Sequence, residues 1–212
     1  MSTFDLEEQE QLAALKAWWK THGNLVLTTV TLALLAVAAW NGWTWYQRAN
    51  SAEAAGLYET LQQAARSSDT KAARDAAGVI LEKYSGTAYA PLAALVSAKV
   101  HFQAGDLKTA RAQLEWVISS AKQDEVRAVA RLRLASVLSD DGVPEDALKT
   151  LDAPHPAAFE SLFAEARGDI LVSQGRMADA RAAYQNAQER ADGKDGAQRA
   201  SLQFKLDAIG GT

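Results

Sequence analysis

The most pronounced pattern of hydrophobic and polar positions is a long apolar stretch in the first quarter of the chain. Between Lys20 and Arg48 lie 27 positions without a formally charged side chain, and His22 is the one residue among them that can gain a charge near neutral pH. A helix of about 20 mostly apolar residues spans the roughly 30 Å hydrocarbon layer of a bilayer. The pattern therefore predicts a single transmembrane helix over residues 25–46.

Two other interpretations of this stretch fit less well. A buried core helix rarely runs this long without charge. The apolar region of a cleaved signal peptide has about 7–15 residues behind a basic segment, whereas acidic residues precede the stretch here. The threonines at positions 28, 29 and 31 do not conflict with a membrane helix, because a helical hydroxyl can bond back to the carbonyl one turn earlier.

Aromatic residues flank the predicted span. Five of the six tryptophans lie just before it or at its far end. Tryptophan and tyrosine are enriched where a membrane protein meets the two headgroup layers. The residues predicted to lie at the membrane interfaces are Trp18, Trp19, Trp40, Trp43, Trp45 and Tyr46.

Basic residues on either side of the span predict its orientation. Lys16 and Lys20 precede the span and Arg48 follows it. Because cytoplasmic flanks carry the excess of Lys and Arg, the N-terminal side is predicted to be cytoplasmic. In a bacterium, residues 47–212 would then form a periplasmic domain.

Residues 1–24 form the predicted cytoplasmic tail. The pattern of the tail fits a short amphipathic helix with Asp5 as its N-cap and with Leu12, Leu15 and Trp19 at helical spacing. Such a helix could lie in the headgroup region. The alternative, that these residues are the first turns of the membrane helix, stays open.

Beyond residue 90 the pattern changes to a repeated helical hairpin. A glycine is followed five residues later by an alanine in three places, which are Gly105 and Ala110, Gly142 and Ala147, and Gly175 and Ala180. The glycines are 37 and 33 residues apart, and each lies between two apolar helical segments. Each glycine is predicted to end the first helix in a left-handed turn, and each alanine to let the second helix approach closely.

The sequence also predicts helices in the rest of the domain. Alanine is abundant, and glycine and proline are scarce outside a few turns, which favours an all-α fold. The first helices of the three hairpins are predicted at 92–102, 126–138 and 159–172, an earlier and weaker pair at 52–66 and 70–84, and a C-terminal capping helix at about 196–209. Pro154 and Pro156 end a short second helix.

This period resembles the tetratricopeptide repeat, which has about 34 residues and a helix–turn–helix unit. Small residues stand seven positions before each turn glycine, at Ala98, Ala135 and Gly168. The consensus tryptophan and most closing prolines of the repeat are missing, so these are degenerate copies. The alternative is a coincidental periodicity in a helical bundle.

Three stretches carry a further resemblance, namely residues 10–23, the run 131–138 with 147–152, and residues 167–175. With the anchor and the repeats in this order, the chain resembles the YfgM family of ancillary subunits of the SecYEG translocon. The resemblance implies an inner-membrane protein that associates with the translocon and with the membrane-anchored chaperone PpiD. It would help newly exported proteins reach periplasmic chaperones. In some bacteria the family is linked to envelope-stress signalling.

Signatures of other chemistry are missing from the sequence. The formal net charge of −4 provides no basic stripe for nucleic acid, and cysteine is absent. The histidines at 22, 101 and 155 match no metal-binding pattern, and no nucleotide-binding loop is present. His101 is predicted to be packed and hydrogen-bonded. We therefore expect no cofactor, no metal and no catalytic activity.

The predicted function is protein binding on the concave face of the first helices. By the register of the repeats, this groove includes Lys99, Phe102, Gln103, Ser136, Ser139, Asp169 and Val172. Phe102 is the predicted anchor, because exposed aromatic residues contribute much of the contact energy at interfaces. The competing functions are a scaffold for another cell-envelope assembly and a hydrolase with an unrecognised site.

Overall fold

The computed structural model describes residues 4–191 and 196–210, with the side chains of residues 4–7 and 9 excepted. All regular secondary structure in these ranges is helical, which confirms the predicted all-α fold. The chain divides into two compact units, Met1–Asn50 and Ser51–Thr212. Helix α1, Phe4–Arg66, supplies the first unit and also the first helical segment of the second.

The first unit exposes its apolar side chains. Leu32 and Leu35 are 62% and 60% exposed. An 18-residue window between Glu10 and Arg66 has a mean hydropathy of 1.8 and is 6% buried, so by length and composition α1 can cross a membrane. The predicted boundaries at residues 24 and 46 are not helix ends, and they stay predictions.

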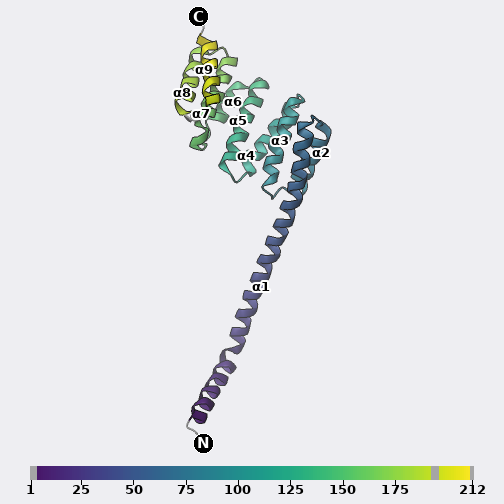
Figure 1. Ribbon diagram of the computed structural model, residues 1–212, viewed down its shortest axis with the longest axis vertical. Helices are drawn as coiled ribbons and strands as arrows, with labels where there is room; N and C mark the ends of the chain where they lie inside the picture. The colour runs from purple at the N-terminus through teal and green to yellow at the C-terminus, as the bar shows by residue number, and fades with distance from the viewer. Residues whose placement is uncertain (1–3, 192–195, 211–212) are drawn as a thin grey trace. The chain divides into compact units, whose positions relative to one another are not determined.

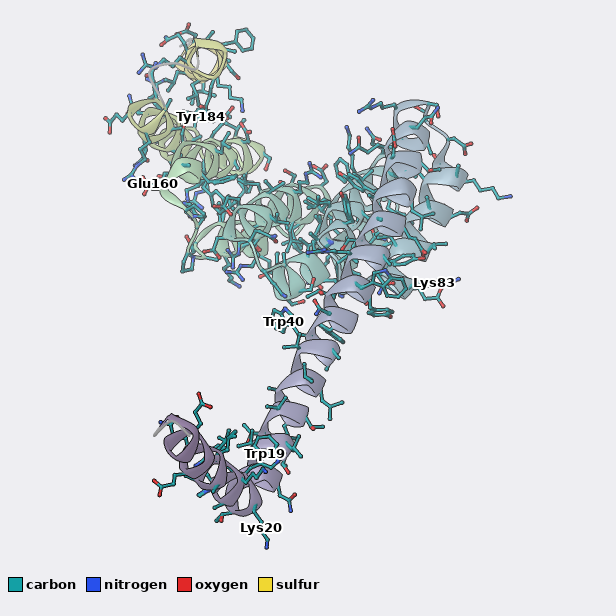
Figure 2. The ribbon with its side chains drawn as sticks, turned by 60° about the horizontal axis from the view of Figure 1, so that its bottom comes forward. Trp19, Lys20, Trp40, Lys83, Glu160 and Tyr184 are labelled. Carbon is teal, nitrogen blue, oxygen red and sulfur yellow. The ribbon has the colours of Figure 1, made fainter. Side chains whose placement is uncertain are left out.

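The predicted tail belongs to the same helix as the apolar stretch. Figure 2 shows the direction of this helix changing near Trp19 and Lys20. Gly23 lies beneath the Trp19 ring, where an added Cβ would be 3.1 Å from Nε1. The side chain of Asp5, the predicted N-cap, lies outside the described residues. The threonine prediction is confirmed for Thr28 and Thr29, whose hydroxyls donate to the carbonyls four residues earlier at 2.7 and 2.8 Å.

The second unit is a stack of helical hairpins (Figure 1). After the last turns of α1, its elements are α2 Thr70–Lys83, α3 Tyr89–Gln103, α4 Leu107–Ser120, α5 Asp124–Asp140, α6 Pro144–Leu151, the 3₁₀ turn η1 Ala157–Phe159, α7 Glu160–Ser173, α8 Met177–Arg190 and α9 Gly196–Gly210. Each helix from α2 to α7 packs on the next, and α3, α5 and α7 also contact one another in series. The predicted hairpins, the weaker first pair and the final helix are thereby confirmed.

Three equivalent turns join α3 to α4, α5 to α6 and α7 to α8. Gly105, Gly142 and Gly175 have φ of 78°, 80° and 73°, as predicted. In the first turn, the Asp106 N–H donates to the His101 carbonyl at 2.9 Å and the Gly105 N–H donates to the Phe102 carbonyl at 3.0 Å. The other two turns repeat both bonds. This is the Schellman pattern, which satisfies the last carbonyls of a helix.

Small residues lie where the paired helices meet. The alanines that follow the three turns, Ala110, Ala147 and Ala180, are fully buried. Ala98 and Ala135 are at most 1% exposed, and Gly168 is also buried. The Tyr184 ring of α8 lies against Gly168, and an added Cβ there would approach its Cε1 to 2.4 Å. The absence of a side chain at this position is therefore what admits the tyrosine between α7 and α8.

Helix α9 covers the last hairpin. Leu202 is fully buried against Tyr184 and Ala187. The Lys205 Nζ donates to Glu165 at 2.8 Å and to Asp169 at 2.7 Å. Burial disfavours the charged form of Lys205, but the hydrogen bonds that Lys205 donates to Asp169 and Glu165 outweigh it and raise the pKa of Lys205.

We expect Gly168→Ala to destabilise the second unit by about 1–3 kcal/mol, because the added methyl must displace the Tyr184 ring from a packed junction. Urea unfolding of the full chain in mild detergent, followed by circular dichroism, measures the change. The matched control is Gly78→Ala in α2, where no atom lies within 4 Å of the added Cβ. This control should be stabilising by about 0.5–1 kcal/mol. Equal effects of both substitutions would contradict the packing argument.

The turn before α4 predicts a pH dependence. The pKa of Asp106 is lowered to about 2, because the Thr109 side chain and backbone N–H and then His101 donate to its carboxylate. A depressed folded-state pKa gives stability that is present above the ordinary value of about 3.9 and is lost as pH falls toward 2. The stability difference between the native chain and Asp106→Asn should therefore be largest above pH 4 and shrink toward pH 2. A difference that stays constant over this range would refute the assignment.

Candidate protein-binding surface

A hollow of about 340 Å³ lies between α3 and α5, over α4. It is lined by Ala98, Lys99, Phe102, Leu114, Arg133, Ser136 and Val137. Leu114 and Val137 belong to the main core cluster, and Phe102 packs partly against it. The floor is therefore apolar and rigid, and the charged residues stand beside it.

A second hollow of about 290 Å³ continues from the first across α3 to the last turns of α1. It shares Lys99 and Arg133 with the first hollow. Its other lining residues are Gln62, Ala65, Arg66, Val96, Val100 and Gln103. We call the two hollows together the α3–α5 surface. All of its residues belong to the second unit.

The positively charged side chains Lys99 and Arg133 of this surface have no carboxylate partner among residues 4–191 and 196–210. Nη1 of Arg133 donates to the Leu95 carbonyl at 2.9 Å, a neutral acceptor. Burial lowers the pKa of Arg133, and Tyr58 partly offsets this. An arginine remains charged at neutral pH despite such a shift.

The structure brings together four of the seven predicted groove residues. Lys99, Phe102 and Ser136 line the first hollow, and Gln103 lines the second with Lys99. Phe102 is half-buried against the core, where the sequence predicted an exposed ring. Its ring can still contact an occupant, because it forms part of the wall of the hollow.

The other three predicted residues lie elsewhere. Ser139 is in the last turn of α5 and lines neither hollow. Asp169 accepts hydrogen bonds from Tyr184 and Lys205, and Val172 packs beside Ile209 of α9. The face of α7 that carries Asp169 and Val172 is thus occupied by the chain's own last helix. It is separate from the α3–α5 surface.

Arg133 is the principal surface residue that the sequence interpretation missed. It stands three positions before Ser136 and therefore on the same stripe of α5. Val96 occupies the equivalent position on α3, three before Lys99, and it lines the second hollow. Extending the predicted register one turn toward the start of each helix would have found both.

Side chains that could support other chemistry are engaged in packing. Within the described part of the chain, no group of three or more acidic or histidine residues could hold a metal ion. The His101 Nδ1 is 2.9 Å from Asp106 Oδ2, which confirms that His101 is hydrogen-bonded. The His155 ring stacks on Phe163 with centroids 3.8 Å apart.

Comparison with known proteins agrees with this architecture. A family model described as a tetratricopeptide repeat-like domain matches residues 16–211. The ancillary SecYEG translocon subunit of Neisseria gonorrhoeae is 31% identical over 208 residues, which cover 96% of this chain and 98% of that protein. The subunit of the same name from Aggregatibacter actinomycetemcomitans is 30% identical, covering 89% and 92%. That of Escherichia coli K12 is 28% identical, covering 84% and 85%.

These similarities extend over the apolar helix and over the whole repeat stack. They agree with the resemblance drawn from the sequence strings, and they leave no large segment of the chain unmatched. The chain belongs to the family of ancillary SecYEG translocon subunits and contains a tetratricopeptide repeat-like domain.

Proposed function

We propose that this protein is a non-catalytic, membrane-tethered interaction subunit of the SecYEG translocon in a bacterial inner membrane. The observation that carries the proposal is the 31% identity, over 96% of the chain, to a protein named for that role. The stack of helical hairpins supports it, because such stacks form extended protein-binding surfaces.

In this proposal residues 25–46 span the membrane, with residues 1–24 in the cytoplasm and the repeat domain in the periplasm. The uncovered apolar side chains of α1 support the span, because an exposed apolar surface of this length needs a non-aqueous environment. Lys16 and Lys20 before the span, against Arg48 after it, support the orientation. The six aromatic residues at its two ends would lie among the headgroups.

The proposed role of the α3–α5 surface is to hold a partner protein near the channel. Its partners would be the membrane-anchored chaperone PpiD or exported proteins in transit. A membrane tether makes such binding effectively intramolecular, with effective concentrations in the millimolar range for short linkages. A contact that is weak in solution can therefore be well populated at the translocon and still release its partner.

Photo-crosslinking in cells tests the partners. A photoreactive residue in place of Trp43 should give adducts with channel subunits, because Trp43 is 60% exposed at the end of the predicted span. The products are identified by mass spectrometry. Adducts with cell-wall or outer-membrane assembly proteins in place of channel subunits would favour the scaffold alternative and contradict the translocon assignment.

The aromatic wall of the first hollow should matter for capture of partners. We expect Phe102→Ala to reduce co-purification of PpiD or exported proteins by about tenfold, as for an interface residue worth more than 1 kcal/mol. Phe204→Ala is the matched control, because Phe204 is 75% exposed on α9 and lines neither hollow. Circular dichroism verifies that both variants fold. Equal capture by a folded Phe102→Ala variant would exclude the α3–α5 surface as the binding site.

Protease added to spheroplasts tests the topology. The repeat domain should be digested from outside, while an epitope placed on the N-terminal tail should survive until the membrane is permeabilised. A periplasmic protein and a cytoplasmic protein serve as controls for access. A protected repeat domain beside a digested periplasmic control would reverse the orientation.

A further inference from the structure

The distribution of charge along the first helices points to the chemistry of the partner. Helix α3 contains no Asp or Glu, and α5 contains none between Glu125 and Asp140. The same two segments carry Lys99, Arg127, Arg131 and Arg133. The whole chain has a formal net charge of −4, so this positive region is local and opposes the overall charge.

The other arginines of α5 have acceptors within the fold. Arg127 is paired with Asp124 and donates to the Ala121 carbonyl at 3.2 Å. Arg131 donates to the Pro154 carbonyl at 2.8 Å. Arg133 likewise donates to a backbone carbonyl, that of Leu95. What sets Lys99 and Arg133 apart is that both line one hollow, and in the described part of the chain neither has a carboxylate partner.

The last hairpin has an equivalent helix junction, and there the charged side chains are paired. Helix α5 packs on α3 and α4. Helix α9 packs on α8 and is joined to α7 by the bonds from Lys205 to Glu165 and Asp169. Lys99 and Asp169 each follow a buried small residue by one position, Ala98 and Gly168. At the last junction Asp169 is neutralised by Lys205 from α9. At the first, Lys99 faces a second cation, Arg133, and the junction is hollow.

We propose that the α3–α5 surface binds an acidic amphipathic segment of a partner protein, with a side-chain carboxylate at Lys99 and Arg133 and an adjacent apolar side chain in the hollow between Phe102, Leu114 and Val137. This inference rests on the protein-binding function proposed above and names the chemistry of the ligand. A carboxylate between two cations forms charge-assisted hydrogen bonds, the stronger class. The apolar floor favours a peptide over a bare anion, because a peptide can also bury an apolar side chain there.

Synthetic peptides test the inference with the full chain in phosphatidylcholine nanodiscs. The probe is a fluorescent 16-residue helical peptide, acetylated and amidated, with leucines along one face and glutamates beside them. Two otherwise identical peptides carry glutamine or lysine in place of glutamate. We expect the glutamate peptide to bind at least tenfold more tightly than the glutamine peptide, with a difference that narrows as salt rises.

Charge reversal on the protein provides the decisive comparison. Lys99→Glu should weaken binding of the glutamate peptide at least tenfold and strengthen binding of the lysine peptide. Arg133→Gln should weaken binding of the glutamate peptide. Lys108→Glu is the matched control, because Lys108 is exposed on α4 and lines neither hollow. It should leave both affinities unchanged. Circular dichroism verifies that the variants fold, and a gain for the lysine peptide with Lys99→Glu but not with Lys108→Glu separates recognition from loss of structure and from the change in net charge.

Any of three results with the peptides would overturn the proposal. The first is that the native chain does not bind the glutamate peptide, and the second is that it binds the glutamate and glutamine peptides equally. The third is that Lys99→Glu and Lys108→Glu have equal effects. If binding of dihexanoyl phosphatidylglycerol depends on Lys99 and binding of the peptide does not, the ligand is an anionic lipid and the proposal is wrong. If Phe102→Ala reduces co-purification of partner proteins but peptide binding is independent of charge, the protein-binding function stands and the acidic partner is excluded.

Discussion

The repeat domain depends on the close approach of paired helices beside a left-handed glycine. Each hairpin needs a turn that reverses the chain within a few residues and a small residue that lets the backbones meet. Gly105, Gly142 and Gly175 supply the turns, and the alanines five positions later supply the contact. Because the hairpins cannot bury their apolar faces alone, each is completed by its neighbours. The core therefore extends from one hairpin to the next, with Leu81 and Trp116 packed against two of its clusters.

The two units place their apolar residues in opposite ways. In the repeat domain, alanine, leucine and valine face inward and are covered by the next helix. In residues 10–50 the leucine and tryptophan side chains are exposed on a single helix. The first arrangement is stable in water, and the second requires another medium or partner. One sequence thus contains a water-soluble fold and a segment whose environment must come from outside it.

Much of this architecture could be predicted from the sequence, because helix ends and small-residue contacts depend on local chemistry. The glycine–alanine spacing identified the hairpins, and the prolines at 154 and 156 identified the short α6. The surface was harder to predict. Lys99, Phe102 and Ser136, which the repeat register selected, line one hollow, but the register could not indicate that Lys205 of α9 would pair with Asp169 or that Phe102 would be half-buried. Those outcomes depend on which helices meet in space.

The series of neighbouring contacts also has a kinetic consequence. From α2 to α9, each helix packs chiefly on the one before and the one after it. Folding that relies on contacts close in sequence is fast and can begin at any hairpin. A chain delivered from its N-terminal end can therefore fold progressively, each hairpin docking on a finished one. Helix α9, which arrives last, would close the stack through Leu202 and the Lys205 ion pairs.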